Sequence, residues 1–72
     1  MRDPYSILKY FEYQHLPPHL QTVSQPFNEL AHKLVDSYNQ MEVDIPEAVT
    51  SLRKLLEAKD CAVRATILVN GN

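Results

Sequence analysis

Apolar residues recur every three or four positions between residues 19 and 38. Because an α-helix turns once in 3.6 residues, this spacing puts them on one face of an amphipathic helix. The apolar positions are Leu20, Val23, Phe27, Leu30, Leu34 and Tyr38. Pro26 lies inside the segment and lacks the N–H that the helix would use. The pattern predicts a helix over about residues 19–38, bent near Pro26.

A second segment with helical spacing runs from about residue 45 to residue 65. Its apolar positions are Ile45, Ala48, Leu52, Leu55, Leu56, Ala62 and Val63. It begins with a capping residue, Asp44, an early proline and an acidic first turn, which together are typical of a helix start. The polar residues 39–43 are a short connection. The two helices therefore predict an antiparallel hairpin.

The segments outside the hairpin differ in composition. Asp3 as a cap and Pro4 at a first helical position predict a short helix from Asp3 to about Tyr10. The run up to Pro18 should then leave the helix, because a residue before proline avoids the α region. We call residues 1–18 the arm. The tail, residues 66–72, is apolar and β-branched before a stop at Asn70-Gly71, and we expect it to pack on a neighbour or fray.

The chain is short for a stable core. With 72 residues it forms one domain, and a chain of this size buries only about 60% of its unfolded surface. Its single cysteine, Cys61, permits no internal disulfide, and no Cys/His cluster suggests structural zinc. We therefore expect an all-α chain, with a short N-terminal helix, an arm and a kinked hairpin, that assembles into a homo-oligomer.

Charge and hydropathy exclude several classes of protein. A net charge of −2 and a pI near 5.8 disfavour a protein that coats DNA or RNA, which needs a basic face. No apolar run reaches the roughly 18 residues of a membrane span, and the N-terminus lacks the order of a signal peptide. One free thiol fits a reducing cytoplasm. A small anionic ligand remains compatible with this composition.

The arm is rich in aromatic rings. Rings outside helices can stack on nucleobases, although most loop aromatics are buried against helices. For Tyr10 and Phe11 we favour burial. Tyr13 and His15, which lie beside Gln14 and two prolines, are the better candidates for ligand contact.

The predicted helix over residues 45–65 carries charges on one flank. Arg53, Glu57, Asp60 and Arg64 are spaced by four, three and four, which is typical of two exposed ion pairs. By helical angle, Lys59 instead falls within the apolar stripe. It must extend its ammonium to water, pair, or point into a polar pocket between subunits.

Neither a metal site nor a catalytic site is indicated. The spacing of His15 and His19 is not one helical face, because two prolines intervene, and no acidic residue completes a ligand set with His32. Cys61 has no nucleophile motif around it, and a single glycine excludes a phosphate-cradling loop. We expect no enzyme activity and no cofactor.

Three segments resemble a known family. They are FEYQHLPPHLQ (residues 11–21), FNELA (27–31) and LRKLLEAKDCAVRA (52–65). In this order they are similar to the small phage proteins of the anti-CBASS and anti-Thoeris hairpin-domain family. The resemblance implies a homohexamer in the host bacterial cytoplasm that sequesters cyclic oligonucleotides without cleaving them, and that binds neither polymeric nucleic acid nor membranes.

The resemblance also implies two ligand sites. Cyclic dinucleotides would lie under the arm between paired protomers, with Tyr13 stacking on a base and His15, Pro17 and Pro18 shaping the arm. The histidine here comes two residues after the tyrosine, whereas in the family it follows directly. Lys33 is the substitute for the family's basic residue early in the hairpin.

Cyclic trinucleotides would bind where three protomers meet, at Arg64, and Lys59 is a further candidate for phosphate contact. Two alternatives stay open. One is capture of the cyclic ADP-ribose isomers of Thoeris defence by the same hairpin. The other is a helical protein–protein interaction module that uses its leftover apolar stripe and binds no small ligand.

Overall fold

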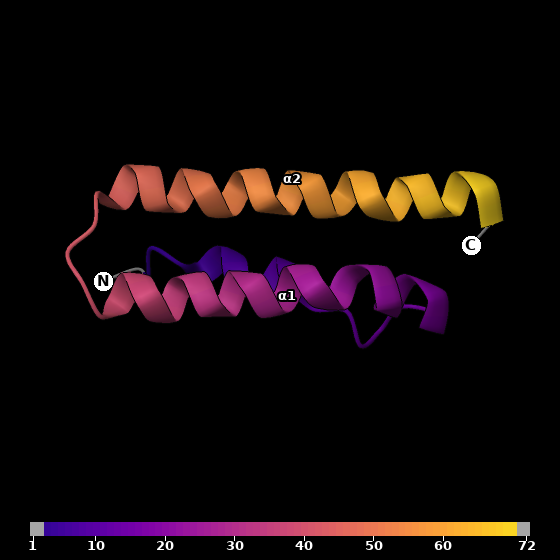
Figure 1. Cartoon of the computed structure of the whole chain (residues 1–72), viewed down its shortest axis with the longest axis horizontal. Helices are drawn as coiled ribbons and strands as arrows, with labels where there is room; N and C mark the ends of the chain where they lie inside the picture. Colours follow the sequence, from indigo (N-terminus) through magenta and orange to yellow (C-terminus); the bar gives the residue numbers. More distant parts are fainter. Residues whose placement is uncertain (1–2, 71–72) are drawn as a thin grey trace.

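The computed structural model describes residues 3–70 and confirms an all-α hairpin. A short 3-10 helix, η1 (Ser6–Phe11), precedes the two long helices α1 (Pro18–Asn39) and α2 (Ile45–Asn70). Figure 1 shows α1 and α2 side by side and antiparallel, with η1 beside α1, and η1 packs against both long helices.

The start of α2 is the one that the sequence predicts. An Asp44 carboxylate oxygen accepts a hydrogen bond from the backbone N–H of Glu47 at 3.0 Å, and the Asp44 carbonyl accepts one from the N–H of Ala48 at 2.9 Å. The side chain thereby satisfies one of the amide donors that a helix N-terminus leaves unpaired. This cap fixes where the connection ends and α2 begins.

The hairpin buries a narrow face of each long helix. The buried side chains of the hairpin are Leu20, Ser24, Ala31 and Val35 on α1 and Ala48, Leu52 and Lys59 on α2. Two positions of the predicted stripes, Leu30 and Ile45, are instead 46% and 44% exposed. Two of the buried residues, Ala31 and Ala48, are small, and small side chains let packed helix axes approach more closely than leucines do. The buried face of α1 is therefore rotated slightly from the apolar stripe that the sequence predicts.

The hydroxyl groups of Tyr38 and Ser51 link α1 to α2. The hydroxyl oxygens of Tyr38 and Ser51 lie 2.6 Å apart, and the Ser51 hydroxyl donates to the Ala48 carbonyl, also at 2.6 Å. Since the Ser51 proton is used within its own helix, the Tyr38 hydroxyl is the donor in the first bond. The Tyr38 ring also contacts the Tyr5 ring, with centroids 5.8 Å apart.

The N-terminal helix differs from the expectation. Instead of an α-helix from Asp3 to about Tyr10, the chain makes a turn and then the 3-10 helix Ser6–Phe11. Asp3 caps the turn, because its carboxylate accepts from the Tyr5 N–H at 2.9 Å, but Pro4 is not in the helix. Nucleating an isolated α-helix is costly, so a segment of six residues favours the tighter 3-10 form.

The tail also differs from the expectation. Residues 66–70 continue α2 as regular helix instead of fraying, and packing of this tail on a neighbour stays a prediction. The predicted stop at Asn70-Gly71 extends beyond the described residues. The β-branched residues cost only a few tenths of a kcal/mol each in a helix that is already nucleated. The end of α2 leaves Leu68 and Val69 both 84% exposed. Helix α1 is continuous through Pro26, and the bend there stays a prediction.

The molecule is elongated, with extents of 42 × 20 × 18 Å. Its radius of gyration is 13.4 Å, compared with about 11 Å for a compact domain of this length. Its accessible surface of 5125 Å² exceeds the roughly 4,600 Å² of a typical monomer of the same mass. Within residues 3–70, no helix has an apolar stretch long enough to cross a membrane.

Candidate functional site: the arm and the outer face of α2

The arm is folded onto the hairpin and is not an extended segment. After η1, residue 12 is extended, and a turn follows in which the Leu16 N–H donates to the Tyr13 carbonyl at 3.0 Å. The Gln21 side-chain amide donates back to the carbonyls of Leu16, at 2.7 Å, and of Gln14, at 3.3 Å. The first turn of α1 therefore holds the end of the arm in place.

Phe11 anchors the arm in the core. Its side chain is 0% exposed and belongs to the same hydrophobic cluster as Val35, Ala48 and Leu52. Burial of Phe11 is thus confirmed. Burial of Tyr10 is wrong, because that ring is 58% exposed, and the Lys9 ammonium lies 5.2 Å from its centroid. In this short helix, neighbouring side chains point in different directions, so only one of the two rings reaches the core.

The four arm residues proposed for ligand contact lie together in the chain just before and at the start of α1. Tyr13 and Pro17 are half-buried, and His15 and Pro18 are exposed. Pro18 is the first residue of α1, where its missing N–H removes no hydrogen bond. Tyr13 is therefore partly accessible to solvent, and His15 is more exposed.

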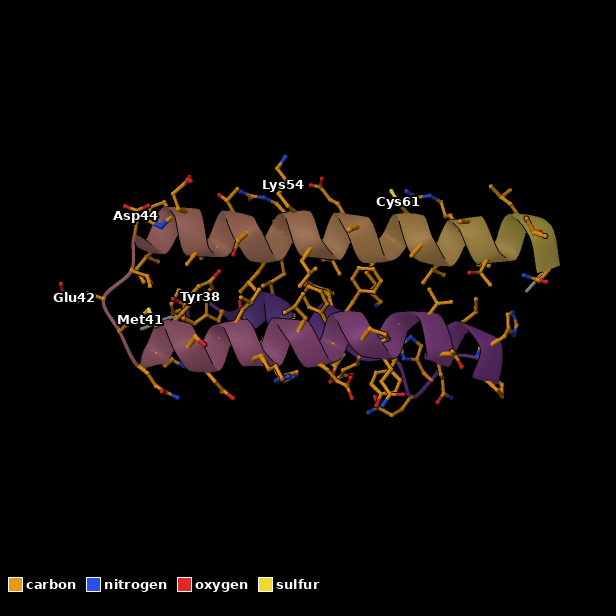
Figure 2. The ribbon with its side chains drawn as sticks, in the orientation of Figure 1. Tyr38, Met41, Glu42, Asp44, Lys54 and Cys61 are labelled. Carbon is orange, nitrogen blue, oxygen red and sulfur yellow. The ribbon has the colours of Figure 1, made fainter. Side chains whose placement is uncertain are left out.

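The three basic candidates lie in three different environments. Lys33 is exposed on α1. Arg64 is exposed on α2 and donates to the Cys61 sulfur at 3.3 Å. Figure 2 shows Cys61 pointing away from α1, which places this contact on the outer face of the hairpin. Lys59 is only 8% exposed and lies on the inner face.

Lys59 pairs inside the same chain. Its ammonium donates to the Tyr10 carbonyl at 2.9 Å, across 49 residues of sequence. Of the three alternatives that the sequence left open for this lysine, pairing is the one observed. The carbonyl compensates part of the cost of removing an ammonium from water. Any contact of this side chain with a phosphate stays a prediction.

Two open hollows were not predicted from the sequence. One, of about 670 Å³, lies at the hairpin turn, where Figure 2 shows Tyr38, Met41, Glu42 and Asp44 close together. The other, of about 530 Å³, lies on η1 and is lined by Ser6, Ile7, Lys9 and Tyr10. The second combines an exposed ring with an ammonium. The adjacent residues Lys9 and Tyr10 could have indicated this hollow in the sequence, but we expected Tyr10 to be buried.

In the part of the chain that the structure describes, no group of three or more His, Cys, Asp or Glu side chains could hold a metal ion. Cys61 is a free, exposed thiol whose recorded neighbour is the Arg64 guanidinium. The surface of the described chain carries rings, cations and an exposed histidine, which are groups that can bind an aromatic anion.

Comparison of the chain with protein-family models, with curated proteins and with solved structures finds no match. The fold and the site therefore define a small helical hairpin with an aromatic arm. The family resemblance rests on the three sequence segments alone, and what it implies about function is a proposal.

Proposed function

We propose that this protein is a phage immune-evasion sponge, which binds the cyclic di- or trinucleotide messengers of bacterial CBASS defence and releases them intact on unfolding. The observation that carries the proposal is the folded arm. It keeps Tyr13 and His15 partly exposed at a fixed position beside α1. The segments of the resemblance supply the ligand class.

The folded arm supports a stacking role for Tyr13. A ring that contacts a nucleobase adds about 1–3 kcal/mol per base, provided that it needs little ordering on binding. The Gln21 contacts to the preceding turn reduce that ordering. A half-buried ring has one part packed on its own chain and one part free for a ligand, which suits this role.

The two hollows on one copy of the chain are not enclosed. Nanomolar capture, however, requires about 12 kcal/mol. Enclosure by a second copy would remove the ligand from water and strengthen its contacts with cations. The excess surface and the exposed Leu68 and Val69 support self-association, and the resemblance supplies a homohexamer as its form.

The proposal divides the basic residues between two sites. Lys33 is exposed on α1, where it would contact a phosphate of a dinucleotide bound between paired copies. Arg64 lies on the outer face of α2, where an interface of several copies can form. Capture is non-covalent in both sites, so no enzyme activity is required.

Native mass spectrometry of the purified protein, with and without a panel of cyclic nucleotides, tests the proposal. We expect an oligomer whose mass increases by whole numbers of ligands, and heat should release each ligand unchanged. Recovery of no ligand from any panel member, or of hydrolysed products alone, would refute it. Including cyclic ADP-ribose isomers decides between the two sponge variants.

Tyr13→Ala sharpens this test, with Tyr13→Phe as the matched control that keeps the ring. We expect the alanine variant to lose dinucleotide binding at least tenfold, equivalent to about 1.4 kcal/mol, while the oligomer stays intact. The phenylalanine variant should bind like the parent chain. Loss of assembly in the alanine variant would make Tyr13 a core residue and contradict its ligand role.

A helical interaction module is the second candidate. It is favoured by Leu68 and Val69, which form an apolar end of α2 that nothing within the described chain covers. This function predicts a pure chain that is monomeric and binds no panel member, together with a stoichiometric protein partner in a pull-down. The same mass spectra therefore separate the two candidates.

A further inference from the structure

Two side chains from opposite helices hold consecutive carbonyls at the end of η1. Lys59 on α2 donates to the Tyr10 carbonyl at 2.9 Å, and Asn28 on α1 donates to the Phe11 carbonyl at 3.1 Å. The last carbonyls of a helix have no partner within it, and lysine or amide groups can satisfy them. The two donors therefore cap the C-terminal end of η1 from both sides of the hairpin.

Both contacts are long-range in sequence. Lys59 lies 49 residues from Tyr10, and Asn28 lies 17 residues from Phe11. They form only when the arm lies on an already folded hairpin. Between them, the Phe11 side chain is completely buried. One charged donor, one amide donor and one ring thus restrain the same turn of chain.

The burial of Lys59 needs this explanation. Burying a lysine that is only 8% exposed costs free energy that an apolar residue of similar length would not cost, so packing alone does not account for Lys59. A hydrogen bond from a charged donor is stronger than one between neutral groups. The Tyr10 carbonyl is the one acceptor recorded for this ammonium.

We infer that Lys59 and Asn28 are positioning residues that fix the arm, and with it Tyr13, against the hairpin. We call the two donors and the carbonyls of Tyr10 and Phe11 the arm latch. The inference deepens the proposed function and rests on it in one respect, namely that the arm carries the ligand-contacting ring. Lys59 acts through the arm and does not contact the phosphate. This role differs from the one that the sequence suggested for Lys59.

The latch is tested by hydrogen exchange of the full chain, read by mass spectrometry. Lys59→Met keeps the length of the side chain and removes its charge and donors. The matched control is Lys54→Met on the same helix, because Figure 2 shows Lys54 pointing away from α1 and it is exposed. We expect amides of residues 6–16 to exchange about tenfold faster in Lys59→Met, while α1 and α2 keep their protection and Lys54→Met matches the parent.

Asn28→Ala is the second variant, in case Lys59→Met does not fold. It removes the other donor and should also speed exchange in the arm. Unchanged arm exchange in both variants would overturn the latch. A Lys59→Met chain that loses ligand affinity while its arm stays protected would overturn it too, because Lys59 would then contact the ligand directly.

Ligand binding is measured on the same samples. A looser arm should weaken binding through Tyr13, so Lys59→Met should lose affinity together with arm protection. An opened arm with unchanged affinity would overturn the positioning role. A parent chain that binds no cyclic nucleotide would remove the proposed function, while the exchange data would still decide the latch. The two failures are therefore distinguishable.

Discussion

The completely buried ring of Phe11 offers the sharpest test of the fold. Phe11→Ala removes a ring that contributes to the central cluster and leaves a cavity between η1, α1 and α2. Such a substitution typically lowers the free energy of unfolding by about 3–5 kcal/mol, so we expect a loss of at least about 3 kcal/mol for this variant. A domain of this length has a total stability of roughly 4–11 kcal/mol, so the variant would lose a large part of it.

Thermal and urea unfolding followed by circular dichroism at 222 nm measure the loss. At roughly 4–8 °C per kcal/mol, the melting temperature should fall by at least about 12 °C. The protein concentration must be the same in every sample, because self-association would itself shift the transition.

Tyr10→Ala is the matched control, since it removes the neighbouring ring, which is 58% exposed. We expect it to cost under about 1 kcal/mol, mainly its contact with Lys9. If the two variants lose the same stability, Phe11 is not the anchor of the arm, and the reasoning from burial to stability would be refuted for this chain.

Three further substitutions test single contacts. Ser24→Ala should raise the free energy of unfolding by about 1 kcal/mol, because the Ser24 hydroxyl is buried without a partner among residues 3–70 and alanine favours helix. A fall in stability would show that the hydroxyl has a partner. Asp44→Ala should lower the free energy of unfolding by about 1 kcal/mol, because it removes the cap of α2. The control Asp36→Ala, at an exposed position, should change it by less than about 0.5 kcal/mol, and equal effects of the two variants would contradict the capping role. Arg64→Ala should weaken cyclic trinucleotide capture at least tenfold, compared with Arg53→Ala as an equal change of charge, and unchanged capture would leave Arg64 as a surface residue.

Much of the hairpin could be predicted because its signals are local. The Asp44 cap and the spacing of apolar residues depend on neighbours within a few turns, and such patterns hold whatever the rest of the chain does. The same local reasoning misjudged residues 66–70, because β-branched composition was given more weight than the tendency of a helix to continue once formed. It also put Leu30 in the core, where Ala31 and Val35 are buried instead.

Less of the candidate site could be predicted. The ring-rich arm and its candidate residues Tyr13 and His15 are visible in the sequence, but the folding of the arm onto the hairpin is not. The Lys9 and Tyr10 contact was missed, since exposure of a ring depends on which neighbouring side chain reaches the core first. Phe11 occupies that position.

The sequence alone therefore determined the helical class, the hairpin, the cap of α2 and the unusual position of Lys59 within an apolar stripe. Only the tertiary structure decided what Lys59 does there, because its partner is a backbone carbonyl 49 residues away. Every residue except proline has the same backbone groups, so no sequence pattern identifies which carbonyl a distant lysine will reach. Burial of the Phe11 ring holds the end of η1 against both long helices, and this places the Tyr10 carbonyl within reach of Lys59.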